Sequence, residues 1–132
     1  MRGNMEANTA VFIEEAYEQL CDGLSTGNWQ PFFASLGDTV DFIWPYPPGA
    51  GHYTGAEGRN KVIEFLGLIG GDGNRLTEIR LVSKTTGSDR IIFEDLSSGE
   101  FFNQPYTGRH CVVLAVGDVK ITSFHEYAAP AS

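Results

Sequence analysis

Cysteine and long apolar runs are both scarce in this sequence of 132 residues. The two thiols, Cys21 and Cys111, have neither the spacing of a zinc site nor the density of a secreted disulfide scaffold, so we expect reduced thiols and no bound metal. No apolar run approaches the roughly 20 residues that a membrane helix needs. The first ten residues also lack the apolar region of a signal peptide. These absences predict a soluble, cytoplasmic protein with no membrane partner.

Positive charge is the second shortage. The chain has 9 Lys and Arg residues against 17 Asp and Glu residues, which gives a formal net charge of −8. A chain with this charge repels phosphate backbones, so we expect no nucleic-acid partner. Its length predicts one domain over residues 1–132, large enough to bury a core and still enclose a pocket.

Hydrophobic periodicity divides the chain into a helical first half and a β-rich second half. Apolar residues recur at helical spacing from Ala10 to Leu24. Further helices are predicted at 29–36 and 56–69, with one strand at 38–44 between them. The last sixty residues alternate with a period of two and predict four antiparallel strands, at 75–86, 89–98, 109–116 and 119–128.

This order of elements predicts an α+β domain in which a cone-shaped, curved antiparallel sheet is wrapped on three N-terminal helices. The mouth of such a cone is a natural site for a small molecule. The segment "IWPYPPGAGHYTG", residues 43–55, is too rich in proline and glycine for a central strand, yet it carries Trp44, Tyr46, His52 and Tyr53. We therefore predict that it forms a mobile rim, with Trp44 and Tyr46 facing into the pocket and His52 exposed to solvent.

Four stretches, in this order, carry a family resemblance over nearly the whole chain: "TGNW", "GDTVDFIWPYPPG", "YTGAEGRNKVIEFL" and "GDVKITSFHEY". The sequence resembles the SnoaL-like branch of the nuclear transport factor two-like superfamily, which also includes ketosteroid isomerase-type enzymes. The resemblance implies the cone-shaped fold, no cofactor, and a homodimer formed through the convex face of the sheet. It does not settle the reaction, because this fold hosts unrelated chemistries.

The catalytic residues of the better-known relatives are mostly missing here. Phe42 stands where the resemblance places the base of ketosteroid isomerase, so we do not expect a steroid isomerase mechanism. The Asp-Arg-Asp set of limonene epoxide hydrolase-type enzymes is also missing, because "IIFEDLSS" contains no arginine. Glu126 occupies the place of a pocket glutamate found in the closing strand of similar phenazine-biosynthesis proteins.

Glu126 and His110 are the candidate catalytic residues, as groups able to move a proton. Glu126 and His125 point to opposite faces of the last strand, and the sequence leaves open which face lines the pocket. His110 alternates with residues expected to be buried. A two-residue hairpin at 117–118 would place His110 and Glu126 on opposite faces, and only a bulge or a three-residue loop lets them face each other.

The candidate substrate contacts are five aromatic side chains: Tyr17, Trp44, Tyr46, Phe65 and His125. Our first hypothesis is a small, cofactor-independent SnoaL-like enzyme that acts on an apolar small molecule by general acid-base catalysis, as an isomerase, cyclase, dehydratase or hydrolase. The alternatives are a non-catalytic domain of the same fold that binds a hydrophobic ligand, and an accessory protein whose open sheet face serves only for dimerisation.

Overall fold

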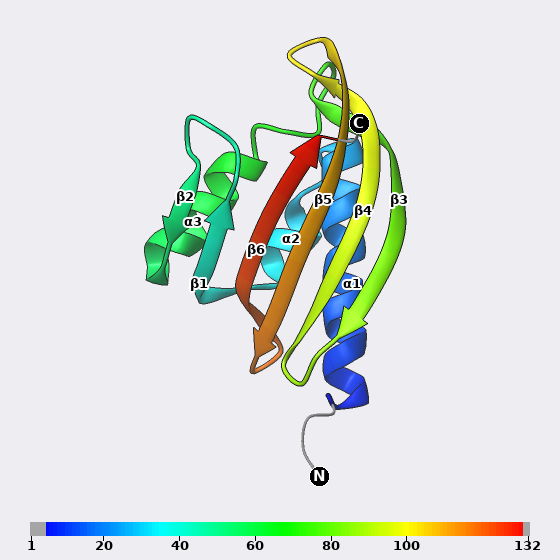
Figure 1. Cartoon of the computed structure of the whole chain (residues 1–132). Coiled ribbons are helices and arrows are strands. Elements are labelled where there is room, and N and C mark those ends of the chain that lie inside the picture. Colours follow the sequence, from blue (N-terminus) through cyan, green and yellow to red (C-terminus); the bar gives the residue numbers. More distant parts are fainter. Residues whose placement is uncertain (1–4, 131–132) are drawn as a thin grey trace.

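The computed structural model describes residues 5–130 (Figure 1). Three helices and six strands follow one another in the chain: α1 (Ala7–Thr26), α2 (Gln30–Ala34), β1 (Leu36–Trp44), β2 (Gly51–Tyr53), α3 (Gly55–Leu66), β3 (Arg75–Thr86), β4 (Arg90–Phe101), β5 (Gln104–Gly117) and β6 (Lys120–Pro130). Within the described residues, no helix is both long and apolar enough to cross a membrane.

The six strands form one curved sheet in the order β2-β1-β6-β5-β4-β3. Figure 1 shows the long strands β3, β4 and β5 bending around α1, while α3 lies beside β1 and β2. This architecture confirms the predicted α+β fold with helices on the concave side of an open sheet. One pair differs from the expected antiparallel arrangement, because β1 and β6 run parallel. They are distant in sequence, so no hairpin imposes an antiparallel direction on them.

Hydrophobic side chains from the sheet and the helices meet on the concave side and form the core. Phe42, Phe93 and Phe124 are almost completely buried there, and Ile13 and Leu20 cover them from α1. The alternation of β1 sends Phe42 and Trp44 into this core and Asp41 to the outer face. The period-two pattern of the sequence therefore identified the buried face of β1 correctly.

The hairpin between β5 and β6 contains the feature that decides the geometry of the site. Its turn residues, Asp118 and Val119, have φ angles of 53° and 51°, as in tight two-residue hairpins. The register then shifts between Ala115 and Val116. Beyond this bulge, even-numbered residues of β5 pair with even-numbered residues of β6, as Val112 does with Glu126. His110 and Glu126 consequently lie on the same face.

The segment between β1 and α3 differs in one respect from its predicted form. Residues Gly51–Tyr53 form a short strand, β2, which pairs with the free edge of β1. A three-residue strand at a sheet edge needs no strong periodic pattern, and this explains why the sequence did not reveal it. The predicted mobility of residues 47–51 stays a prediction.

Candidate functional site

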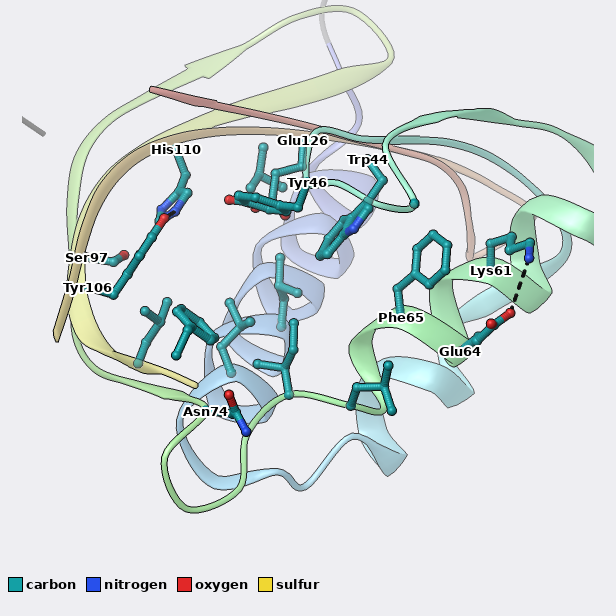
Figure 2. A pocket seen from close by; sticks show the side chains of 18 of the residues that line it. Trp44, Tyr46, Lys61, Glu64, Phe65, Asn74, Ser97, Tyr106, His110 and Glu126 are labelled. Carbon is teal, nitrogen blue, oxygen red and sulfur yellow. Dashed lines mark hydrogen bonds and ion pairs between the residues drawn. The ribbon is translucent and has the colours of Figure 1, made fainter. Parts of the chain in front are cut away.

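A cavity of about 730 Å³ lies between the concave face of the sheet, α1, α3 and the segment that follows β1. Most of its wall is apolar, and the contributing side chains include Leu20, Phe65, Leu76 and Val112. In Figure 2, the hydrogen-bonding side chains of Ser97, Tyr106, His110, Tyr46 and Glu126 are grouped at one end, while Lys61 and Glu64 lie on α3 at the opposite side. The cavity is therefore large enough for a small organic molecule. Its buried hydrogen-bonding groups gather at one end, which we call the polar end, and the exposed ion pair of Lys61 and Glu64 lies at the other.

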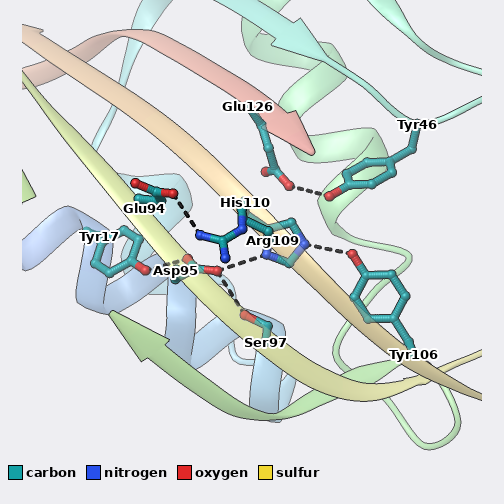
Figure 3. A network of polar contacts seen from close by, with 9 residues as sticks. All are labelled: Tyr17, Tyr46, Glu94, Asp95, Ser97, Tyr106, Arg109, His110 and Glu126. Atoms are coloured by element: carbon teal, nitrogen blue, oxygen red, sulfur yellow. Dashed lines mark hydrogen bonds and ion pairs between the residues drawn. The ribbon is translucent and has the colours of Figure 1, made fainter. Parts of the chain in front are cut away.

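His110 and Asp95 form a buried ionisable pair at this polar end (Figure 3). They are direct cross-strand partners on β5 and β4, and His110 Nδ1 lies 2.9 Å from Asp95 Oδ1. Because a carboxylate accepts, Nδ1 donates, and this bond leaves Nε2 directed toward Tyr106. The pair thus fixes the orientation of the imidazole.

Asp95 is held in its charged form by three donors. Tyr17 donates to its Oδ2 at 2.6 Å, and Ser97 and His110 donate to its Oδ1 at 2.9 Å each. Burial acts to raise the pKa of Asp95, but the hydrogen bonds from His110 and Tyr17 outweigh it, so this pKa lies below its ordinary value. Tyr17 is itself fixed by stacking on Phe93, with ring centroids 4.1 Å apart.

The imidazole of His110 is stabilised in its protonated form. Burial acts to lower its pKa, but the hydrogen bond to Asp95 and the nearby negative charges of Glu126 and Asp95 raise the pKa above its ordinary value. The hydroxyl of Tyr106 lies 2.7 Å from His110 Nε2. A protonated His110 donates to this hydroxyl, whereas a neutral His110 accepts from it.

Glu126 and Tyr46 make up a second polar pair. Tyr46 donates to Glu126 Oε2 at 2.8 Å, and the side chain of Glu126 is buried among the cavity residues. Loss of hydration raises the pKa of Glu126, although the charge of His110 and the bond from Tyr46 partly oppose the rise. Burial beside this carboxylate also raises the pKa of Tyr46. Glu126 is therefore a carboxyl group that can hold a proton closer to neutrality than an exposed glutamate.

The structure brings six of the seven predicted site residues to this cavity: Tyr17, Trp44, Tyr46, Phe65, His110 and Glu126. His125 does not belong to the cavity wall. It points to the outer face of the sheet, where its Nε2 lies 3.2 Å from Asp41 Oδ1. The alternation along β6 requires this, because Glu126 occupies the inner face at the next position.

At the polar end of the cavity, three residues were not found from the sequence: Asp95, Ser97 and Tyr106. The sequence did contain a signal for Asp95 and Ser97. Residues 91, 93, 95 and 97 share one face of β4, and residues 91 and 93 belong to the core. Tyr106 likewise shares its strand parity with His110. A buried aspartate in such a pattern requires partners, and this requirement marks it as a candidate for function.

A second cluster of imidazole and carboxylate groups lies outside the cavity. Within residues 5–130, Asp41, His52 and His125 place three possible metal-ligand atoms within 4.8 Å of one another. They come from β1, β2 and β6, on the outer face of the sheet.

Comparison with known proteins gives structural relatives but no sequence-family match. No family model and no curated protein matches the chain. An NTF2-like protein from Anabaena variabilis shares 26% identity, with 92% of this chain and 90% of that chain covered and a TM-score of 0.79. A candidate SnoaL-like polyketide cyclase from Jannaschia shares 12% identity, with coverages of 93% and 89% and a TM-score of 0.70. An LEH-like epoxide hydrolase from M. tuberculosis shares 20% identity, with coverages of 92% and 85% and a TM-score of 0.66.

Proposed function

Since this chain belongs to the NTF2-like superfamily and resembles its SnoaL-like branch, we propose that it is a small acid-base enzyme that needs no cofactor. Its substrate is an apolar small molecule that carries a ring and a carbonyl group. The fold alone does not assign a reaction, so the proposal depends on the residues of the cavity. The observation that carries it is the presence of two separate proton-holding pairs, His110–Asp95 and Glu126–Tyr46, at the same end of an apolar cavity.

The two pairs suit proton transfer at a carbon atom next to a carbonyl group. The carboxylate of Glu126 takes a proton from this carbon. The electron pair of the broken C–H bond forms the C=C bond of the enolate, and the π pair of the C=O bond moves to the carbonyl oxygen. A hydrogen bond from the Tyr106 hydroxyl, which itself accepts from protonated His110, stabilises the resulting enolate. The proton is then returned to the same or another carbon. Such a step is common to isomerisation, cyclisation and dehydration.

The environment of each group supports this division of roles. A raised pKa makes the Glu126 carboxylate a stronger base than an exposed glutamate, and it brings the group closer to the pH at which acid-base catalysis is efficient. The raised pKa of His110 favours its protonated form, which donates to Tyr106, more than in an exposed histidine. Apolar side chains make up most of the remaining cavity wall, and hydrogen bonds in such surroundings are stronger than in water.

A non-catalytic binding domain is the second candidate, and one observation favours it. Both buried carboxylates already have protein donors, since Tyr17, Ser97 and His110 satisfy Asp95 and Tyr46 satisfies Glu126. A purely structural polar network would look the same. Binding and proton transfer must therefore be measured separately.

Deuterium exchange separates the two candidates without knowledge of the natural substrate. The protein is incubated in D₂O with a panel of cyclic ketones and enones, and mass spectrometry follows the incorporation of deuterium next to the carbonyl group. Binding of each probe is followed by the fluorescence of Trp44, which lines the cavity. We expect the wild-type protein to accelerate exchange and Glu126→Gln to lose this acceleration by about 10² to 10⁴-fold, while binding persists.

The matched control is Glu94→Gln. Glu94 precedes Asp95 on β4 but points to the other face, where Arg109 pairs with it at 2.9 Å (Figure 3). This variant should exchange deuterium like the wild type. The opposite result would be that a probe binds tightly to the wild type without accelerated exchange, and that Glu126→Gln binds it equally well. This result would contradict the enzyme hypothesis and favour the binding domain.

A further inference from the structure

The outer face of the sheet carries a cluster of side chains that the cavity does not use. Asp41, His52 and His125 come from three adjacent strands, β1, β2 and β6. His52 and His125 are both register partners of Ile43, one on each side of β1. The two imidazoles therefore flank β1, and the carboxylate of Asp41 lies between them, two residues along the strand.

Both imidazoles direct the same nitrogen atom at one oxygen atom. His52 Nε2 lies 2.5 Å from Asp41 Oδ1, and His125 Nε2 lies 3.2 Å from the same atom. The hydroxyl of Ser123 lies 3.1 Å from His125 Nε2. Two nitrogens and one carboxylate oxygen thus converge on a small volume at the surface, with a hydroxyl beside them.

We infer that Asp41, His52 and His125 form a binding site for a divalent transition-metal ion of the Zn²⁺ type. Ligand bonds of about 2.0–2.2 Å place neighbouring ligand atoms of a tetrahedral zinc ion roughly 3.4 Å apart. The three donor atoms already lie within 4.8 Å of one another, so small side-chain rotations bring them to this spacing. Imidazole ligands select zinc and its transition-metal neighbours over magnesium and calcium, which prefer oxygen ligands.

The charges around the cluster favour a cation. Among residues 5–130, the ion pairs of Asp41 within 4.0 Å are those with His52 and His125. The charge of Arg90 also acts on Asp41, but the guanidinium of Arg90 is paired with Asp89. The formal net charge of −8 also attracts cations to the protein.

A metal ion at this position would join the edge strand β2 to β6, which are not hydrogen-bonded neighbours. The ion would stabilise the position of the short hairpin formed by β1 and β2, and the connection between these two strands contains Tyr46. The site lies on the face opposite the cavity, so this inference does not rest on the proposed enzyme activity.

Zinc titration of the full-length protein without an affinity tag tests the inference. Isothermal titration calorimetry with Zn²⁺ should give one site per chain, and Asp41→Asn, His52→Gln and His125→Gln should each weaken binding at least about tenfold, since even outer-shell changes cost 10- to 100-fold. The chain has three histidines, and His110→Gln is the matched control. It removes the imidazole of the cavity and should leave the affinity unchanged.

Nuclear magnetic resonance of the imidazole nitrogens locates the ion independently. Zn²⁺ should shift the Nε2 signals of His52 and His125 and leave those of His110 in place. The thermal unfolding midpoint of the wild type should also rise with Zn²⁺, because an ion that binds only the folded state stabilises it. Absence of binding at millimolar Zn²⁺, full affinity in Asp41→Asn, or shifts confined to His110 would each overturn the site and leave a surface hydrogen-bond cluster.

Discussion

Replacement of Asp95 by asparagine is the most informative test of the polar network. The substitution keeps the shape of the side chain but replaces one accepting oxygen by an NH₂ group. Oδ2 accepts from Tyr17, and Oδ1 accepts from Ser97 and His110. Whichever way the amide turns, its NH₂ group faces at least one donor in a site where Asp95 is only 4% exposed.

The expected cost follows from these three bonds. If the NH₂ group takes the place of Oδ2, the Tyr17 hydroxyl loses its acceptor, which costs about 1–3 kcal/mol for a buried polar group. The bonds from Ser97 and His110 fall from charged to neutral strength, a loss of roughly 0.5–1.5 kcal/mol each. Because such losses are not additive within one network, we expect Asp95→Asn to lower the free energy of unfolding by about 2–4 kcal/mol.

The loss should depend on pH in a defined way. The pKa of Asp95 is lowered from 3.8, so its contribution is present above pH 3.8 and is lost as the pH falls through the lower folded value. The pKa of His110 is raised from 6.5, so its contribution is present below pH 6.5 and is lost as the pH rises through the higher folded value. The difference between wild type and variant should therefore be largest between about pH 4 and 6.5.

Urea unfolding monitored by the fluorescence of the buried Trp29 and Trp44 measures this difference at several pH values. Ser97→Ala removes one of the three bonds and should cost about 1 kcal/mol. Asp89→Asn is the surface control, since Asp89 is exposed and pairs with Arg90, and it should change stability by less than about 0.5 kcal/mol. A loss below about 0.5 kcal/mol in Asp95→Asn, or a loss that does not vary with pH, would refute the assigned network.

Three further predictions concern the carboxyl group of Glu126, the core residue Phe93 and the oligomeric state. Glu126→Gln should gain stability relative to the wild type as the pH rises above 4.5, because the raised pKa of Glu126 makes its ionisation unfavourable in the folded state. If urea unfolding gives the same difference in stability between variant and wild type at pH 4 and at pH 8, this prediction is contradicted. Phe93→Ala should lower the free energy of unfolding by about 3–5 kcal/mol, because Phe93 is 1% exposed and stacks on Tyr17. A loss of less than about 1 kcal/mol in thermal or urea unfolding would be inconsistent with this packing. The homodimer expected from the sequence should appear in sedimentation velocity at micromolar concentration, and a monomer there would exclude it.

Periodicity along the chain was sufficient to predict most of the helices and strands and the buried face of β1, but it left open which face of β6 lines the pocket. The helical stripe of α1 and the alternation of β3 to β6 predicted the fold class, and the order of motifs predicted the superfamily that the structural relatives confirm. Alternation also singled out His110, whereas Glu126 was singled out by its place in the family resemblance. The inferences from periodicity need only the geometry of one helix or one strand.

The alignment of the strands, and with it the set of side chains that meet, comes from the assembled sheet. The bulge at Ala115 and Val116 brings His110 onto the face of Glu126, and a one-residue change of register would separate them. The pairing of β1 with β6 places Asp41 beside His125, which is 84 positions away in the chain. Periodicity determines which side chains of one strand share a face. Their partners on other strands depend on the register, and the register forms only when distant segments of the chain pair.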